Sequence, residues 1–338
     1  MDTQEQQTAV QSPVFSDEHV PAARHAYTWA LLNLVIFWVI DMAVKIVLSK
    51  VVPKDVPEFV SQIITFAPMY LIAFPVYLLL SKRLTATVPE KHKMNVGQIL
   101  LAATCAEFLG IAGNIIGTIV NFALTLLLGH RTDETFLAEG VFGSSSILFV
   151  LTAVVIAPVI EEMMFRKILI DRIHKYGDTA AILISGFMFG LFHGNFTQFF
   201  YAAAVGMLFA FIYVRTGKII HTIVLHMLLN FWGSAMPLIL MHSIDKDVLL
   251  DVFVNRNMNA VLSNLSQFAP LFVMGFCNLL IAAAGLIVLI VNIKKIKVDP
   301  PIAPLPKSKR FPTAVLNLGF ILLFAVCVFD IIRQIGLI

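Results

Sequence analysis

The stretch APVIEEMMFR, residues 157–166, decides the fold of this chain because it places two adjacent carboxylates and an arginine at the end of an apolar run. That run starts near residue 146 and is long enough to cross much of a membrane as a helix. A charge near the bilayer centre costs about 2.5 to 3.5 kcal/mol on insertion scales, so such residues usually face a partner or a water-filled cavity. We therefore expect Glu161, Glu162 and Arg166 to belong to a polar site inside a membrane protein.

The composition supports a polytopic membrane protein. Of the 338 residues, 59% are hydrophobic and 13% are charged, and the mean hydropathy is +0.87. Soluble domains carry about 25% charged residues. The apolar runs approach the length of a membrane helix and show no alternating pattern of a membrane barrel. The predicted fold class is an all-α, polytopic transmembrane helical bundle with the lipid bilayer as a partner. The net charge of +3 gives no indication of nucleic acid binding.

The chain divides into a tail and one membrane domain. Residues 1–26 are polar and Gln-rich and lack the features of a signal peptide, so we expect a cytosolic tail. Residues 27–338 then form the membrane domain, with about nine spans and eight as the alternative. The apolar runs occupy approximately residues 27–50, 57–80, 97–129, 146–170, 178–194, 197–214, 218–240, 268–293 and 313–336.

Lysines and arginines predict the orientation. Every even-numbered run ends in a basic cluster, and the four clusters lie at residues 82–93, 166–175, 215–218 and 294–310. Cytoplasmic loops of membrane proteins are enriched in Lys and Arg. The pattern predicts a multi-pass protein of the cell membrane, with its N-terminus in the cytosol and its C-terminus outside.

Three further polar features lie within the apolar runs. Asp41 and Lys45 stand four residues apart in the first run, and Asp330 and Arg333 stand three apart in the last. Both spacings suit ion pairs on one helix face, so we interpret them as structural pairs. Glu107 has no such neighbour, and it either faces a cavity or pairs across helices.

The central stretch separates its two carboxylates. Glu162 and Arg166 are four residues apart and can pair on one helix face. Glu161 is rotated by about 100° around the helix and stays outside that pair. Glu161 is therefore the predicted residue for chemistry.

Two later runs supply complementary groups. His193 ends the fifth run, while His226 and Asn230 share one helical face in the seventh. A turn at Gly177 lies at equal distance along the chain from Glu161 and His193. In antiparallel helices that meet at this turn, Glu161 and His193 lie at the same level.

Three motifs carry a family resemblance. They are EExxxR at Glu161, Glu162 and Arg166, FxxxH at Phe189 and His193, and HxxxN at His226 and Asn230. In this order they resemble the motifs of the CPBP intramembrane proteases, which include type II CAAX prenyl endopeptidases and bacterial bacteriocin-processing or immunity-associated proteins. The resemblance covers approximately residues 140–240, the predicted catalytic core.

The resemblance implies roles for the motif residues. Glu161 would be the general base that activates water, and His193 would help to hold that water. His226 and Asn230 would stabilise the oxyanion, while the ion pair of the EExxxR motif would brace the site. The implied protein is an intramembrane endopeptidase that hydrolyses a peptide bond of a peptide or membrane-protein substrate. No cofactor is required by this mechanism.

A zinc-dependent protease is the first alternative. Glu161, His193 and His226 have the residue types of a catalytic zinc site, with Glu162 as the base. The HExxH motif, which places two ligands and a base on one helix, is missing. The residue four positions after His226 is Asn230, whose amide is a poor zinc ligand.

Two non-enzymatic alternatives also stay open. Intramembrane Glu, His and Arg residues build proton relays in transporters, although the two halves of this chain share no repeated motif. A non-catalytic immunity protein would retain the same residues. Loss of cleavage on substitution of Glu161 distinguishes an enzyme from both.

Overall fold

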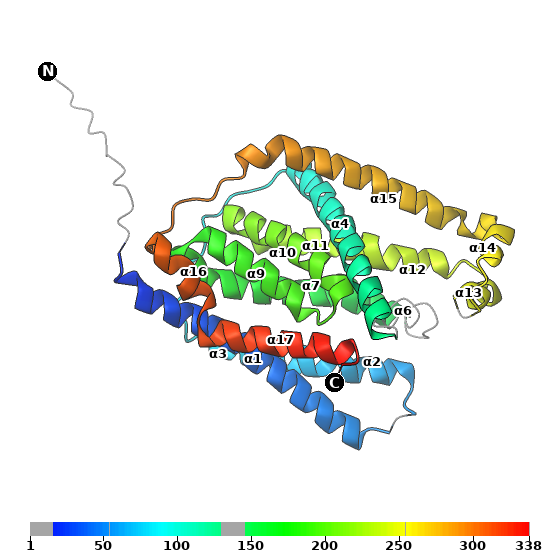
Figure 1. Cartoon of the computed structure of the whole chain (residues 1–338), viewed down its shortest axis with the longest axis horizontal. Helices are drawn as coiled ribbons and strands as arrows, with labels where there is room; N and C mark the ends of the chain where they lie inside the picture. The colour runs from blue at the N-terminus through cyan, green and yellow to red at the C-terminus, as the bar shows by residue number, and fades with distance from the viewer. Residues whose placement is uncertain (1–15, 54, 130–145, 254, 338) are drawn as a thin grey trace.

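The computed structural model describes residues 16–53, 55–129, 146–253 and 255–337. Within these ranges every regular element is a helix (Figure 1). The prediction of an all-α bundle is confirmed. Residues 1–15 of the predicted tail, and the first residues of the predicted core up to 145, lie outside the described residues.

The helices before the central stretch are long. They are α1 (His19–Val51), the continuous segments α2 (Glu58–Ala67), η1 (Pro68–Ala73) and α3 (Phe74–Ser81), and α4 (Val96–Leu128). The helix α1 begins before residue 27, so the end of the predicted tail belongs to the first helix.

The central stretch is one helical run with π-helical segments. Its parts are α6 (Ser146–Leu151), η2 (Thr152–Ile156), α7 (Ala157–Glu162), η3 (Met163–Ile170), α8 (Asp171–Ile173) and the short 3-10 segment η4 (His174–Tyr176). The following helices are α9 (Asp178–Phe192), α10 (Phe196–Thr216), α11 (Ile219–Asn230), η5 (Phe231–Ala235) and α12 (Met236–Met241). The chain ends with α13 (Lys246–Phe253), α14 (Asn259–Ser263), α15 (Leu265–Asn292), η6 (Ile293–Lys295), α16 (Lys307–Val315) and α17 (Leu318–Gln334).

Successive helical runs pass back and forth between two ends of the bundle (Figure 1). One end, called the basic end here, gathers the segments with the four basic clusters. Hydrogen bonds and an ion pair join these segments: Thr87 to Asp171, His92 to Thr216, Ala303 to Lys175 and Arg215 to Asp299. The opposite end contains α13 and α14 (Figure 1). The clusters therefore meet on one side, as the alternating loops predict.

The predicted count of about nine spans is too high by length and composition. Among the described residues, six helices qualify as membrane spans, or up to seven if the bent pair α16 and α17 is one span. The helix α9 has 15 residues, about 22 Å at 1.5 Å per residue, against a hydrocarbon core of about 30 Å. The central run carries Glu161, Glu162 and Arg166, and the last run bends by 50° between α16 and α17. The apolar runs are helical, but these three are not regular spans.

The largest core forms where α1, α3, the central run, α9, α10 and α17 meet. Its fully buried side chains include Tyr27, Phe37, Tyr77, Phe165 and Leu169. Small residues allow helices to approach closely in a membrane, where apolar packing alone gives little driving force. At Gly285 of α15, an added Cβ would lie 2.0 Å from the Thr104 carbonyl oxygen of α4. Close backbone packing therefore holds α15 against the rest of the bundle.

Candidate active site

The backbone of the site is built around Pro158. In a π-helix the N–H of residue i+5 donates to the carbonyl of residue i, and the residue five positions after Ala153 is Pro158. Proline has no N–H, so the Ala153 carbonyl lacks that donor. Asn230 supplies it, because its side-chain amide donates to the Ala153 oxygen at 2.8 Å. Asn230 thus ties α11 to the segment that leads into the two carboxylates.

The second π-helical segment, η3, also receives donors from neighbouring helices. The Ser185 hydroxyl of α9 donates to the Phe165 carbonyl at 2.8 Å, and the Tyr77 hydroxyl of α3 donates to the Met164 carbonyl at 3.2 Å. Irregular helix inside a membrane protein is tolerated where protein groups satisfy its backbone. The irregular helix is therefore fixed on two sides by polar side chains.

Glu162 and Arg166 form the ion pair that their spacing predicts. Arg166 Nε lies 3.2 Å from Glu162 Oε2, and both side chains are 0% exposed. The Arg166 guanidinium also stacks over the ring of Phe189, with Cζ 4.3 Å from the ring centroid, and Nη2 donates to the Gly206 carbonyl at 3.4 Å. Buried charges need such partners because desolvation is costly. This pair can brace the site without contact with solvent.

His226 lies between the two carboxylates. Its Nδ1 is 3.0 Å from Glu162 Oε1, and its Nε2 is 3.7 Å from Glu161 Oε2. Because the ionised Glu162 beside Arg166 can only accept, we assign the Nδ1 hydrogen of His226 to this contact. The ring packs against Phe189 and Phe209, each with its centroid 5.8 Å away. The Nε2 edge therefore faces Glu161.

His193 is fixed in a similar way at the end of α9. Its Nδ1 donates to the Phe189 carbonyl at 2.8 Å, which leaves Nε2 without a hydrogen in the neutral ring. The ring packs edge-on against Phe189 at 4.9 Å and lies 6.5 Å from the Tyr201 ring. His193 lies within electrostatic range of both Glu161 and His226. The two histidines therefore share one polar site.

Glu161 is less buried than its neighbour Glu162 and has fewer polar contacts. Its side chain is 26% exposed, and within the described residues it makes no hydrogen bond, only the 3.7 Å approach to His226. It lies within electrostatic range of His193, Tyr70 and Tyr201. An accessible carboxylate beside an imidazole nitrogen is suited to proton transfer with a bound water.

Five of the predicted site residues interact with one another, namely Glu161, Glu162, Arg166, His193 and His226, whereas Asn230 contacts the backbone beside them. Its amide holds the Ala153 carbonyl, and its proposed part in binding an oxyanion stays a prediction. Tyr70 and Tyr201 were not predicted, because no spacing in the sequence links them to the motifs. Glu107 is buried on α4, and no hydrogen bond or ion pair joins it to Glu161 or His193 in the described part of the chain.

The two predicted ion pairs near the chain ends are present. Lys45 Nζ lies 2.7 Å from Asp41 Oδ2, and Arg333 Nη2 lies 3.7 Å from Asp330 Oδ1. They are not isolated from each other, because the Trp38 indole of α1 donates to Asp330 Oδ2 of α17 at 2.6 Å. The first and last helices thus share a polar contact that neither local spacing predicts.

The residue types of the zinc alternative are adjacent, but their arrangement does not form a ligand set. Among the described residues, no three His, Cys, Asp or Glu side chains are grouped as a metal ion would require. Both histidines do donate through Nδ1 to an oxygen, as metal-bound histidines commonly do.

Two comparisons with known proteins bear on this site. A family model described as type II CAAX prenyl endopeptidase Rce1-like matches residues 143–232. The candidate membrane peptidase YdiL of Bacillus subtilis (strain 168) is 27% identical over 174 residues, which cover 49% of this chain and 70% of YdiL. No solved structure matches the chain.

The matched family region contains the whole polar site. It runs from the start of the central stretch to the end of α11 and includes Glu161, His193 and His226. The surrounding chain is a multi-pass bundle with at least six helices that qualify as spans among its described residues. The part of the chain that holds the site is therefore similar to the Rce1-like CAAX prenyl endopeptidase family.

Proposed function

We propose that this protein is an intramembrane endopeptidase in which Glu161 activates a water molecule to attack a peptide carbonyl. The observation that carries the proposal is the contrast between two adjacent carboxylates. Glu162 is fully buried against Arg166, whereas Glu161 is partly exposed, lies 3.7 Å from His226 Nε2 and interacts electrostatically with His193. Of these two adjacent carboxylates, Glu161 is the one that is accessible and makes no hydrogen bond among the described residues.

The first step is proton transfer from water to Glu161. The oxygen of that water forms a bond to the carbonyl carbon of the substrate, and the carbonyl π electrons move to oxygen to give an oxyanion. His193 Nε2 can accept a hydrogen bond from the water because its Nδ1 hydrogen is held by the Phe189 carbonyl. This contact would orient the lone pair of the water toward the scissile carbon.

The oxyanion needs hydrogen-bond donors. A protonated His226 ring, held through Nδ1 by Glu162, has an Nε2–H directed to the same space that Glu161 faces. The second amide hydrogen of Asn230, one turn along α11, is the other donor in this proposal. One such donor is worth about 2.7 to 4 kcal/mol of transition-state stabilisation.

Collapse of the tetrahedral intermediate completes the reaction. The oxyanion re-forms its C=O bond, the C–N bond breaks, and the proton held by Glu161 passes to the leaving nitrogen. The products are a carboxylic acid and an amine, and Glu161 returns to its ionised form. No covalent enzyme intermediate and no net change in oxidation state are involved.

A zinc-dependent reaction with Glu161, His193 and His226 as ligands is the alternative for the same residues. The hydrogen bonds of both Nδ1 atoms to oxygens favour this alternative, because they leave both Nε2 atoms for a ligand. A bound zinc would lower the pKa of its water and polarise the carbonyl. Zinc content of the purified wild type and the His226→Gln protein, measured by mass spectrometry, separates the two mechanisms.

The proposed membrane orientation places the basic end in the cytosol. The four basic clusters gather there, and cytoplasmic segments are enriched in Lys and Arg. The end of α9 with His193 then lies toward the outer side. The test uses intact cells that express the protein with Cys277 replaced by serine. The Asp247→Cys variant should react with a membrane-impermeant thiol reagent, whereas the Lys91→Cys variant should react only after permeabilisation. The reverse pattern would reject this orientation.

The central test compares cleavage by the wild type and by Glu161→Gln. Membranes and purified protein of both forms are incubated with a library of peptides and with membrane-protein extracts, and new termini are identified by mass spectrometry. Termini that require Glu161 define the substrate bond. Equal products from both proteins would reject Glu161 as the base.

A further inference from the structure

The link from α15 to α17 carries more positive charge than the link that precedes α15. Residues 293–311 contain six basic residues and one acid, and all seven charged side chains are exposed. The basic residues are Lys294, Lys295, Lys297, Lys307, Lys309 and Arg310. Residues 242–264, before α15, contain two basic residues and three acids. The positive charge is therefore a property of residues 293–311, which are called the strap here.

The charge of the strap is not neutralised by acids of the described chain. Its single acid, Asp299, is already paired with Arg215 at 2.5 Å. None of its five lysines forms an ion pair with another described residue, and Lys295 donates a hydrogen bond to Asn292 Oδ1 at 3.2 Å. A lysine ammonium group has three hydrogens to donate. The lysines of the strap can therefore bind an anion from outside the chain.

The strap begins at the end of a membrane helix. The apolar helix that contains α15 covers Leu265–Lys295, has 31 residues and qualifies as a span. Its length of about 46 Å at 1.5 Å per residue is close to the roughly 40 to 45 Å of a bilayer with its headgroups. This helix lies along the edge of the bundle, and the strap leads from its end to α16 (Figure 1). The first lysines of the strap therefore lie at the level of lipid headgroups.

Exposed apolar side chains lie beside the lysines at both ends of the strap. Ile293 and Ile296 flank the first two lysines, and both isoleucines are exposed. Phe311 follows the basic first turn of α16 and is 67% exposed. This combination suits the boundary between acyl chains and headgroups, where apolar groups enter the lipid and cations stay at the surface. The strap thus has the two kinds of side chain that a lipid surface requires.

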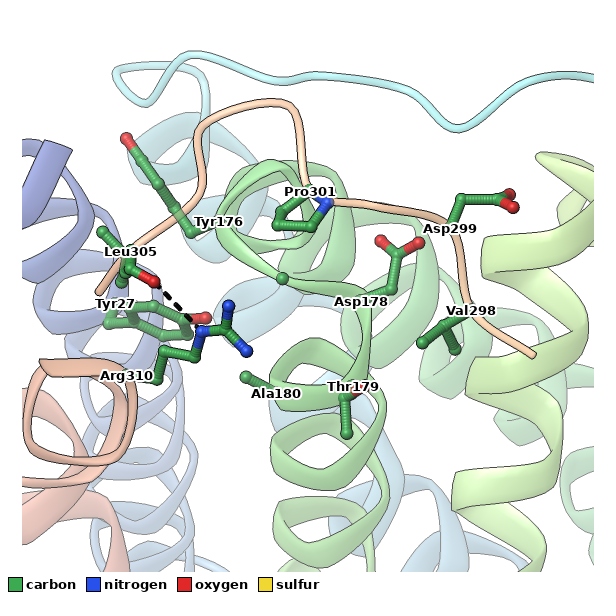
Figure 2. Close-up of a pocket in the computed structure, with 11 residues that line it drawn as sticks. Tyr27, Tyr176, Asp178, Thr179, Ala180, Val298, Asp299, Pro301, Leu305 and Arg310 are labelled. Atoms are coloured by element: carbon green, nitrogen blue, oxygen red, sulfur yellow. Dashed lines mark hydrogen bonds between the residues drawn. The ribbon is translucent and has the colours of Figure 1, made fainter. Parts of the chain in front are cut away.

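Contacts with the rest of the basic end hold the strap in place. The Ala303 N–H donates to the Lys175 carbonyl at 2.8 Å, and Leu305 is buried. Figure 2 shows the chain from Val298 to Leu305 passing over the start of α9, where it covers a cavity of about 160 Å³. Arg310 donates to the Leu305 carbonyl, as the dashed line in Figure 2 shows. Four residues of the strap are prolines, which restrict its backbone. Binding would therefore cost little ordering of the chain.

We propose that the strap binds anionic phospholipid headgroups of the leaflet at the basic end. The lysines contact the phosphate groups, while the exposed isoleucines and Phe311 enter the boundary of the acyl chains. Clusters of four to eight basic residues next to the end of a membrane helix are suited to such headgroups. An acidic protein surface would use the lysines but would leave the apolar side chains without a partner. The proposal is independent of the endopeptidase function.

Contact with lipid is tested by fluorescence quenching in the full-length protein. The reporter is Phe311→Trp in a protein whose native Trp29, Trp38 and Trp232 are replaced by phenylalanine. The protein is placed in phosphatidylcholine vesicles that contain a small fraction of either dibrominated phosphatidylglycerol or dibrominated phosphatidylcholine. The anionic lipid should quench the reporter at least about twofold more strongly, because the lysines concentrate it. In the matched control Phe253→Trp, at the opposite end of the bundle, the two lipids should quench equally.

Salt and a second reporter extend this measurement. Raising the ionic strength from about 0.1 M to 1 M shortens the Debye length from about 10 Å to 3 Å, so it should remove the difference between the two lipids. Ile296→Trp, in the same tryptophan-free protein, reports on the other end of the strap and should show the same preference for the anionic lipid.

Charge variants assign the preference to the strap. In the Phe311→Trp protein, Lys307→Gln combined with Lys309→Gln should bring the quenching by the two lipids close to equality. The same two positions replaced by arginine should keep the preference. Lys91→Gln combined with Lys93→Gln removes as much charge from another exposed segment of the basic end and should also keep it. If the glutamine pair in α16 prevents insertion, the salt dependence of the two strap reporters is the test.

The contrary outcomes are distinct. Equal quenching of Phe311→Trp by both lipids would overturn the proposal and leave the lysines to a polar partner such as an acidic protein. A preference that falls equally in both glutamine pairs, or that also appears at Phe253→Trp, would show a general surface potential instead of binding by the strap. Loss of the preference only in the α16 pair supports the proposal.

Discussion

Two neighbouring regions of this site differ sharply although one peptide bond joins them. The buried bracket consists of Glu162, Arg166 and the Nδ1 side of His226, and its two charged side chains are fully excluded from solvent. The reactive face consists of Glu161, His193 and the Nε2 side of His226, and its carboxylate is partly exposed and makes no hydrogen bond within the described residues. A step of about 100° around a helix separates the two carboxylates.

The difference shows how a membrane protein can keep one carboxylate inert and another reactive. The bracket satisfies Glu162 with an arginine and an imidazole, so its charge is stabilised but unavailable. Glu161 lacks such partners and can exchange a proton with a bound water. Because His226 contacts both carboxylates, the bracket fixes the ring whose other edge serves the reactive face.

The largest expected effect is on catalysis at the reactive face. Glu161→Gln should lower kcat/KM by at least about 10³-fold, because the general base is lost while the shape of the side chain is kept. The thermal unfolding midpoint should change little, since Glu161 makes no hydrogen bond in the described part of the chain. The exposed Glu90→Gln serves as the matched control and should retain wild-type activity. An active Glu161→Gln enzyme would move the base elsewhere.

The next largest effect concerns the stability of the bracket. Arg166→Met should lower the free energy of unfolding by about 3 to 5 kcal/mol, because it leaves Glu162 buried without its main counter-charge. Denaturation of the purified protein in detergent, followed by circular dichroism, measures this loss. Arg83→Met removes an exposed arginine and should cost less than about 0.5 kcal/mol.

A double variant distinguishes charge from packing in the bracket. Glu162→Gln combined with Arg166→Met removes both charges, and it should be more stable than Arg166→Met alone. If the double variant is less stable by the sum of the two single effects, then the pair does not act as a coupled ion pair, and the bracket interpretation fails.

His226 belongs to both regions, so its replacement should have an intermediate effect. His226→Gln should reduce kcat by about 10²-fold to 10³-fold, because glutamine retains an amide donor but loses the charged ring between the carboxylates. Some activity should be measurable, and chelator treatment should not change it. His92→Gln, which replaces an exposed histidine, is the control. Loss of bound zinc together with all activity would support the metal-dependent alternative instead.

Local spacing predicted the contacts that lie within one helix or one hairpin. The pairing of Glu162 with Arg166 and the separate position of Glu161 follow from helix geometry. The turn at Gly177 predicts that Glu161 and His193 lie at one level, and the two residues interact electrostatically. The side chain of His226 was placed in the site from its motif, but its position between two carboxylates depends on the packing of α11 against α7. Sequence periodicity contains no information on that contact.

Two other features required tertiary structure. Asp41 and Asp330 each have a basic partner nearby in the sequence, so local spacing accounts for each pair separately. The packing of α1 against α17 brings the two pairs to one cavity. The predicted number of spans was too high because hydropathy identifies apolar runs but does not reveal helix length or shape. It did not show the 15-residue α9, the 50° bend between α16 and α17 or the π-helical segments of the central run. A π-helical segment shifts hydrogen-bond partners by one residue, which leaves composition unchanged.

The smallest expected effect decides whether Asn230 belongs to the bracket side or to the reactive face. Asn230→Ala should cost about 1 to 3 kcal/mol in stability, because the Ala153 carbonyl loses its donor inside the bundle. Pro158→Ala restores a backbone N–H five residues after Ala153, where the π-helical pattern needs a donor, so the double variant should recover much of the lost stability. Activity then separates the two roles. If Asn230 only supports the backbone, the double variant should regain activity together with stability. If Asn230 is a direct oxyanion donor, the double variant should be stable but about 10²-fold slower than the Pro158→Ala enzyme. The proposed mechanism requires the second result, and full recovery of kcat would remove Asn230 from the oxyanion site while leaving Glu161, His193 and His226 in their roles.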